Sequence, residues 1–166
     1  MITADKKFMA VALEEARLAA EADEVPVGAV LVVNGEVIAR AHNLREGLSD
    51  PTAHAEMLVL REASQRLRRW RLTDATLYIT MEPCAMCAGA AVLARISRIV
   101  YGCRDPKAGA CGSVFDIIRE PQLNHQVEVI GGMLEEACQE IIRRFFEKRR
   151  EKIRDEERWP SPVEGD

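Results

Sequence analysis

Four residues of this 166-residue chain have the types and spacing that a catalytic metal site requires: His54, Glu56, Cys84 and Cys87. The cysteines are three positions apart, so on a helix both thiols point from one face. Pro83 suits the first helical position, and a helix N-terminus lowers the pKa of thiols in its first turn. Zinc accepts two sulfurs and one imidazole, so His54 is the candidate third ligand, which leaves one position for water.

The spacing between His54 and Glu56 predicts that their roles differ. Residues two apart lie on nearly opposite sides of a helix, so both reach one metal only beyond its N-terminal end. Asp50, Pro51 and Thr52 predict such an end, with Asp50 or Thr52 as the N-cap. Glu56 is a poor ligand for a sulfur-rich zinc site and stays free to move protons, which is typical of a catalytic site.

Two other interpretations of the cysteine pair stay open. A Cys-x-x-Cys motif in a cytosolic protein could be redox-active. A closed structural zinc site, with Cys103 or Cys111 as fourth ligand, is the second alternative, although it leaves Glu56 unexplained. Cys103, Cys111 and Cys138 stand among apolar or small residues. We therefore expect them to be free thiols of a reducing compartment, which indicates a cytoplasmic protein.

Composition restricts the kinds of partner. A net charge of −4 argues against indiscriminate nucleic-acid binding, so any RNA site must be a local basic patch. No apolar run approaches the length of a bilayer, and no signal peptide is expected at the charged N-terminus. The length is that of one domain with a sizeable core. Because no apolar run is long enough to span a bilayer, we expect no membrane partner.

Helical and strand patterns alternate along the chain. Helices are predicted over 5–20, 54–67, 83–94 and 113–119, followed by a closing helix with an apolar stripe from Leu134 to Phe146. Strands are predicted over 27–33, 36–40, 75–80, 98–102 and 126–130, the last parallel to the one before it. The alternation predicts an α/β fold with one five-stranded mixed sheet between helices. Residues 1–150 form the predicted domain, and residues 151–166 a charged helical extension with a frayed end.

These motifs resemble the zinc-dependent cytidine and deoxycytidylate deaminase superfamily, and within it the bacterial tRNA adenosine deaminases. The resemblance covers nearly everything from residue 5 to 147 and fades beyond 150. It is carried by residues 24–29, 41–43, 51–57, 80–87, 105–109 and 123–125. It implies a three-layer cytidine-deaminase-like fold and one zinc ion per subunit. It also implies a homodimer that converts adenosine to inosine by hydrolysis at the wobble position of the tRNA anticodon.

The resemblance also implies roles for individual residues. Glu56 is expected to take a proton from water and to deliver protons to the base and to the departing ammonia. Asn43 is expected to contact the flipped nucleoside, although an asparagine here could simply end a loop. Val27 and Lys107 are expected at the same substrate site. The N–H of Ala55 lies at a predicted helix N-terminus, where it could orient the base.

Several polar features have weaker functional interpretations. The basic tract 66–71, with an interleaved Trp70, could bind a phosphate backbone, and a solvated helix end fits it equally. His42 and His125 are expected to be structural or to face RNA. A basic row at helical spacing occurs near the C-terminus, where a solvated face is the first interpretation and RNA contact the second: Arg150, Arg154 and Arg158.

The predicted helix 83–94 has no polar face to offer solvent. One side can pack on the sheet, so the other needs a cover, either a second copy of the chain or the chain's own helices. We predict a homodimer. Two alternatives to the tRNA function stay open: the same chemistry on free cytosine, guanine or a nucleoside, and a zinc-stabilised RNA-binding protein without turnover.

Overall fold

The computed structural model describes residues 1–158, so the predicted fraying of 159–166 lies outside the described residues. One five-stranded sheet has the strand order β2-β1-β3-β4-β5. β1 is antiparallel to β2 and β3, whereas β3, β4 and β5 are mutually parallel, which confirms the predicted mixed sheet. The strands are β1 (Gly28–Val33), β2 (Glu36–His42), β3 (Ala75–Met81), β4 (Arg98–Cys103) and β5 (Glu128–Ile130).

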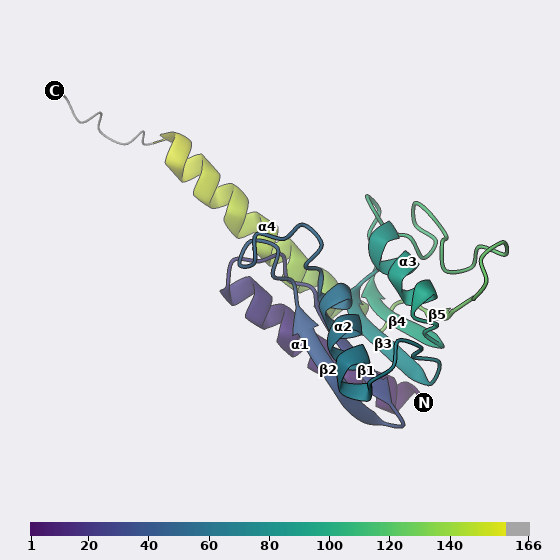
Figure 1. Cartoon of the computed structure of the whole chain (residues 1–166). Helices are drawn as coiled ribbons and strands as arrows, with labels where there is room; N and C mark the ends of the chain where they lie inside the picture. Colours follow the sequence, from purple (N-terminus) through teal and green to yellow (C-terminus); the bar gives the residue numbers. More distant parts are fainter. Residues whose placement is uncertain (159–166) are drawn as a thin grey trace.

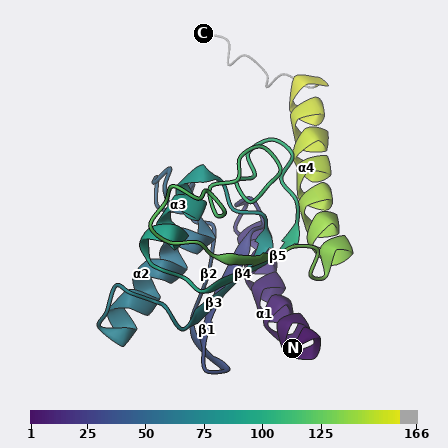
Figure 2. The ribbon, with the colours of Figure 1, turned by 90° about the vertical axis from the view of Figure 1, so that its right-hand side faces the viewer.

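Four helices cover both faces of this sheet and complete three layers. They are α1 (Ile2–Glu21), α2 (Ala55–Leu67), α3 (Ala85–Leu93) and α4 (Glu135–Arg158). Figures 1 and 2 show α2 and α3 on one face of the sheet and α1 and α4 on the other. The α/β three-layer fold predicted from the alternation of elements is therefore confirmed.

The central strand β1 explains why two separate cores form. All six of its residues are buried, as expected for a strand covered on both faces. Successive side chains alternate between the faces. Leu31 therefore packs in the core beneath α2 and α3, while Val30 and Val32 pack with Phe8 and Met9 of α1.

The helix predicted over 113–119 is absent. Those residues form turns and an isolated bridge between Cys111 and Asp116. The N–H groups of Cys111 and Ser113 donate to the buried carboxylate of Glu82. Gly112 adopts a φ of +124°. A tertiary acceptor thus outcompetes the local helical pattern in this segment.

The predicted starts of α2 and α3 also need correction. α2 begins at Ala55 with His54 at the N-cap, rather than Asp50 or Thr52. Asp50 instead accepts hydrogen bonds from the N–H and the hydroxyl of Thr52, at 2.8 and 2.7 Å, and closes a local turn. α3 begins at Ala85 with Cys84 at the N-cap, so Pro83 precedes the helix.

Helix α4 crosses residue 150 without a break, so the predicted boundary between 1–150 and 151–166 falls inside one helix. Its N-terminal half packs on β4 and α1, while its C-terminal half projects from the body of the molecule (Figure 1). The division of the chain at residue 150 stays a prediction.

Candidate active site

The N-termini of two helices meet beside the C-terminal end of β3. His54 is the N-cap of α2, and Cys84 is the N-cap of α3. Cys87 lies one turn into α3, on its buried side. Neither N-cap side chain caps its own helix by a hydrogen bond. Both are therefore available to a ligand at the point where the helices converge.

The distances among these three side chains fit a metal ion. Nδ1 of His54 lies 3.6 Å from Sγ of Cys84 and 3.5 Å from Sγ of Cys87. A tetrahedral zinc with bonds of about 2.3 Å to sulfur and about 2.0 Å to nitrogen separates such atoms by about 3.5 Å. Across residues 1–158, these three form the single group of His, Cys, Asp and Glu side chains close enough to hold a metal.

The two thiols share one negative charge. The pKa of Cys84 falls to about 3, first because Cys87 donates a hydrogen bond to it and then because His54 does. The same bond raises the pKa of Cys87, whose thiol keeps its proton. The hydrogen bond to Cys84 raises the pKa of His54. Cys84 is thus a thiolate at neutral pH, the form that binds metals.

Glu56 lies against the donor set but does not belong to it. Its side chain is 3% exposed, and its Oε2 has no hydrogen-bond partner. Burial raises the pKa of Glu56 to about 7, opposed chiefly by a backbone hydrogen bond and the nearby His54. A buried carboxyl that titrates near neutrality with a free oxygen is suited to exchange protons with a bound molecule.

A cavity of about 470 Å³ opens directly above this group. His54, Glu56 and Cys84 form its polar floor. Its apolar walls come from the segment before β1, the end of β3 and the middle of α4: Val25, Val27, Met81, Ile142 and Phe146. Such a mostly apolar space with a few converging polar groups suits a flat aromatic ligand.

The structure places the predicted substrate residues around this cavity. Val27, Asn43 and Lys107 line it. The N–H of Ala55 donates to Oδ1 of Asn43 at 2.9 Å, so Asn43 satisfies the first turn of α2. Asn43 therefore has the structural role considered from the sequence as well as a place in the pocket. Contacts of Val27, Asn43, Ala55 and Lys107 with substrate stay predictions.

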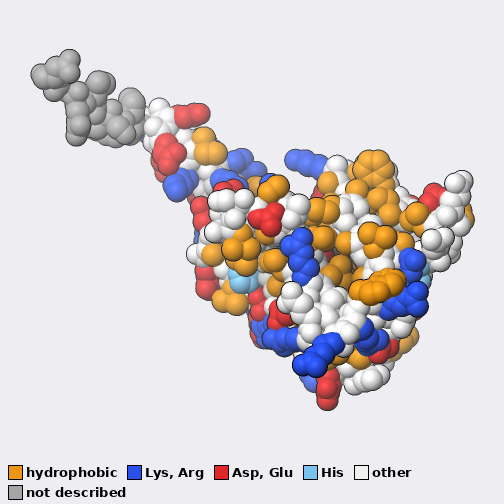
Figure 3. All heavy atoms as spheres, in the orientation of Figure 1, with side chains coloured by type: hydrophobic (Ala, Val, Ile, Leu, Met, Phe, Trp, Pro, Cys, Tyr) orange, Lys and Arg blue, Asp and Glu red, His pale blue; other side chains and the backbone are white. Residues whose placement is uncertain are grey.

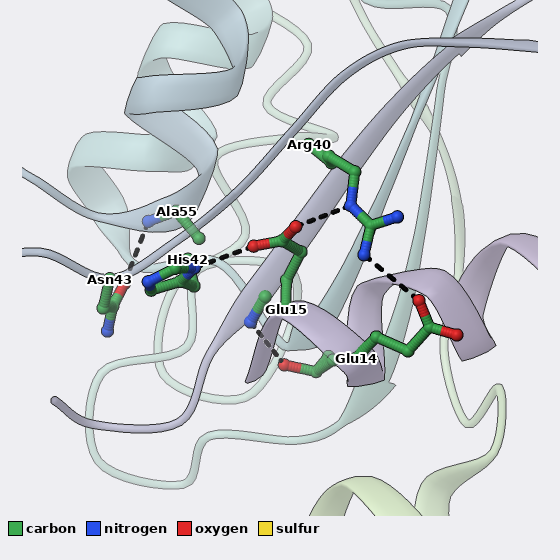
Figure 4. Close-up of polar contacts among 8 residues, drawn as sticks. Glu14, Glu15, Arg40, His42, Asn43 and Ala55 are labelled. Atoms are coloured by element: carbon green, nitrogen blue, oxygen red, sulfur yellow. Dashed lines mark hydrogen bonds and ion pairs between the residues drawn. The ribbon is translucent and has the colours of Figure 1, made fainter. Parts of the chain in front are cut away.

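A polar network supports β2, the strand that ends directly before Asn43. Glu15 of α1 accepts hydrogen bonds from Arg40 at 2.6 Å and makes a second bond with Nδ1 of His42 at 2.7 Å. Figure 4 shows the Glu15 carboxylate between these side chains, with Asn43 and Ala55 beyond them. His42 is therefore structural, which agrees with one of its two predicted interpretations.

Glu82 was not assigned a role from the sequence, yet it lines the cavity. Burial alone would raise its pKa, but hydrogen bonds from Ser113 and from the N–H groups of Asp105 and Cys111 lower it. All these donors belong to residues 104–113, here named the wall loop, because Asp105 and Lys107 line the cavity. A Glu directly before Pro83 was the available signal, but its partners lie more than twenty positions away.

Phe146 and Ile142 were also missed as pocket residues. The sequence places both on the apolar stripe of the closing helix, which predicts a core position. Phe146 is instead 37% exposed and lines the cavity together with Ile142. These two residues of the stripe therefore form part of the pocket rim and are not in the core.

The closed structural zinc site, with Cys103 or Cys111 as fourth ligand, finds no support among the described residues. Cys103, Cys111 and Cys138 are free and buried, and none belongs to the group with His54. Burial raises the pKa of Cys111 to about 12, far from the thiolate form that a fourth ligand needs. His125 lies outside the metal-donor group, and its Nε2 forms a hydrogen bond with the carbonyl of Ile96 at 2.6 Å.

The basic tract 66–71 lies at the opposite end of α2 from His54, about 20 Å away at the rise of an α-helix. Three of its four arginines have local partners. Arg66 pairs with Glu62, Arg69 pairs with Asp74, and Arg71 stacks on Trp70. These local contacts are compatible with a solvated helix end, one of the two interpretations made from the sequence, and the RNA-binding interpretation stays a prediction.

The fold and the donor set define a deaminase. The model of the MafB19-like deaminase family matches residues 3–150. The tRNA-specific adenosine deaminase of Bacillus subtilis (strain 168) is 52% identical over 151 residues, which cover 91% of this chain and 94% of that protein. The tRNA-specific adenosine deaminase of Aquifex aeolicus (strain VF5) is 50% identical over 146 residues, covering 88% and 96%.

A solved structure agrees with these relatives. It comes from a study of A-to-I editing by tRNA:A34 deaminases at the wobble position of transfer RNA. It superposes with a TM-score of 0.79 at 50% identity, covering 81% of this chain and 98% of that one. The chain therefore belongs to the MafB19-like deaminase family and, within it, to the tRNA-specific adenosine deaminases.

Proposed function

We propose that this chain hydrolyses the 6-amino group of adenosine to give inosine at the wobble position of a tRNA anticodon. The observation that carries the proposal is the free Oε2 of buried Glu56, which faces a cavity beside His54, Cys84 and Cys87. Relatives at 50% identity or more, covering nearly their whole length, support the choice of tRNA as substrate.

Zinc is the proposed cofactor, held by His54, Cys84 and Cys87. When bound, it would act as a Lewis acid that makes hydroxide available at neutral pH. Glu56 accepts the proton of the attacking water, because its pKa is about 7 and its Oε2 has no competing partner. Glu56 delivers this proton to the ring nitrogen, takes the second proton from the hydroxyl now attached to the carbon, and passes it to the departing ammonia. The two protons of the water are therefore sufficient, and no other acid is required.

The cavity binds the adenine ring after the nucleotide has been extruded from the anticodon loop. Val27 and Phe146 contribute apolar surface for the base. The amide oxygen of Asn43 accepts the hydrogen bond from the N–H of Ala55 in the first turn of α2, and its NH₂ group is offered to the nucleoside. Lys107 at the cavity edge is placed to contact a phosphate. Closing the base in this space keeps bulk water from the reacting carbon.

The proposed active form is a homodimer in the cytoplasm. Leu93 is 70% exposed on the outer face of α3, where Ala85 and Gly89 precede it at helical spacing. Figure 3 shows hydrophobic side chains gathered on the side that carries α2 and α3. The chain's own helices leave this face open, so a second copy is the proposed cover. Within residues 1–158, no helix is long and apolar enough to span a bilayer.

The test is to incubate the purified, zinc-loaded protein with an anticodon stem-loop that carries adenosine at the wobble position. Inosine should appear at that position alone, detected as A read as G after reverse transcription. The same stem-loop with wobble adenosine moved one position along the loop is the matched control. Free adenosine, adenine, cytosine and guanine should be poor substrates.

The outcomes separate the alternatives. Turnover of free cytosine or guanine that equals turnover of the stem-loop would replace the tRNA proposal with a free-base deaminase. Binding of the stem-loop without release of ammonia would favour an RNA-binding protein. The unpartnered carboxyl of Glu56 argues against the latter, because a structural zinc protein has no use for it.

A further inference from the structure

A buried carboxylate outside the catalytic set lies beside the cavity. Glu82 is 3% exposed and stands at the end of β3, two residues before Cys84. Its two oxygens accept four hydrogen bonds, every one from the wall loop. We propose that Glu82 is a positioning residue, whose carboxylate holds the wall loop in the shape that receives the RNA nucleotide. The nature of the substrate rests on the function proposed above.

The four hydrogen bonds join the two ends of the wall loop to one point. At one end, the N–H of Asp105 donates to Oε2 at 3.0 Å. At the other, the N–H groups of Cys111 and Ser113 donate to Oε1 at 3.0 and 3.1 Å, and the Ser113 hydroxyl donates to Oε2 at 2.5 Å. Hydrogen bonds to a charged acceptor are about twice as strong as neutral ones.

From Asp105 the contacts continue to the cavity edge. Oδ1 of Asp105 accepts hydrogen bonds from the N–H of Lys107 at 3.0 Å and from the N–H of Ala108 at 3.2 Å. Asp105, Lys107 and Ala108 all line the cavity. The position of Lys107 is therefore set by Asp105, and the position of Asp105 is set by Glu82.

Close packing joins the wall loop to the turn that carries the metal ligand. A Cβ atom at Gly109 would lie 2.4 Å from both Cδ and Oε2 of Glu82, so the backbone approaches the carboxylate as only glycine allows. Gly109 forms a bridge with Cys84, and the N–H of Ala110 donates to the carbonyl of Pro83 at 2.8 Å. The Glu82 carboxylate and these two backbone contacts thus hold the cavity wall against the cavity floor.

Replacing Glu82 by Gln tests the proposal with little change of shape. The amide NH₂ would face N–H donors, so hydrogen bonds at one oxygen are lost. In the zinc-loaded enzyme we expect KM for the anticodon stem-loop to rise about tenfold, with kcat within about threefold, because substrate binding is weakened without loss of the chemical groups. Zinc content should stay at the wild-type value.

Two controls separate positioning from general stability. Asp5→Asn removes another buried carboxylate, on the opposite face of the sheet, and should lower stability while leaving KM within about twofold. Ser113→Ala removes a single donor and should raise KM by about threefold, whereas Ser113→Thr keeps the hydroxyl and should restore the wild-type KM. If Glu82→Gln does not fold, the Ser113 pair decides.

A second readout does not depend on the substrate. Hydrogen exchange at the amides of Asp105, Cys111 and Ser113 should be slow in the wild type and faster in Glu82→Gln. Unchanged exchange with unchanged KM would overturn the proposal. So would loss of zinc, or a fall in kcat at constant KM, since either places Glu82 in the metal turn. If wild-type protein fails on the stem-loop but the exchange difference appears, the proposed substrate fails and the loop assignment stands.

Discussion

His54 and Cys84 occupy helix N-caps, where Ser, Thr, Asp and Asn are the stabilising choices. Neither residue uses its side chain to cap its helix, and a missing cap costs about 1 kcal/mol. For α2 the cost is offset by Asn43, whose amide oxygen takes the N–H of Ala55. Two positions that could stabilise helices are thus given to ligand atoms, as functional sites often require.

The separation of roles between Glu56 and the metal ligands can be tested directly. Glu56→Gln should retain one zinc per chain by elemental analysis, because Glu56 lies outside the donor group. Turnover of the stem-loop should fall about a thousandfold, since proton transfer by a positioned side chain contributes on that order.

Cys87→Ala is the matched comparison and should lose both zinc and turnover. If Glu56→Gln emptied the metal site, Glu56 would be a ligand and the proton-transfer role would be wrong. A normal rate in Glu56→Gln would exclude it from both roles.

Local spacing was sufficient for the residues of the donor set and insufficient for their surroundings. A separation of three positions from Cys84 to Cys87, and of two from His54 to Glu56, restricts the geometry within one helix turn. Glu82 and Phe146 carry no such local pattern. The partners of Glu82 lie on another loop, and the exposure of Phe146 depends on where α4 meets the sheet. Both became visible only after the elements had been placed.

At the scale of the elements, Asp5 joins α1 to the sheet. Its carboxylate accepts two hydrogen bonds from Arg98 at 2.9 and 2.6 Å and one from Tyr78 at 2.8 Å. The bonds from Arg98 lower the pKa of Asp5, followed by the bond from Tyr78 and against the effect of burial. Nε of Arg98 is buried and has no hydrogen-bond partner within residues 1–158. No other acceptor is therefore at hand to replace the Asp5 carboxylate.

Asp5→Asn should therefore destabilise the fold by about 3 kcal/mol at pH 7, the usual cost of leaving a buried partner charge unpaired. Because the folded-state pKa of Asp5 is depressed, its stabilisation is present above the unfolded-state pKa and is lost as pH falls through the folded-state pKa. Urea unfolding at pH 7 and at pH 3 should show the difference between wild type and variant shrinking in acid.

The exposed Glu14 of the same helix provides the comparison. It pairs with Arg40 at 3.1 Å, and its side chain is 58% exposed. Glu14→Gln should change stability by less than about 1 kcal/mol. An equal loss in both variants would contradict a special role for Asp5.

Strong periodic patterns were enough to predict nine of the elements that the described residues form, and the mixed sheet follows from their order. The errors occurred where another hydrogen-bond acceptor competes with a predicted helix, over a long range at Glu82 and locally at Asp50. The helix predicted over 113–119 does not form, because the N–H of Ser113 donates to the carboxylate of Glu82. The start of α2 moved to Ala55 because Asp50 closes its own turn with Thr52. The role of Glu82 cannot be recognised from the local sequence, because its donors Cys111 and Ser113 lie far along the chain. The turn that Asp50 closes with Thr52 is local, and it competes directly with the N-cap role expected for these residues.

At the scale of the molecule, the proposed homodimer depends on the open face of α3. Leu93→Glu places a charge on that face and should give a monomer by light scattering at micromolar concentration, where the wild type should have the mass of a dimer. Val37→Glu is the matched control, because Val37 is also exposed, at 40%, but lies on the edge strand β2. A monomeric wild type would refute the proposal.

The order of the site along the chain has a consequence for synthesis. The donor set is complete at Cys87, and β1, the antiparallel partner of β3, precedes it in the chain. Ile142 and Phe146, which form the rim, are made more than fifty residues later. On a translating ribosome the metal-binding floor therefore emerges well before the part of the wall that α4 contributes. For this interval the thiolate of Cys84 is unshielded, and prompt capture of a metal would protect it from oxidation.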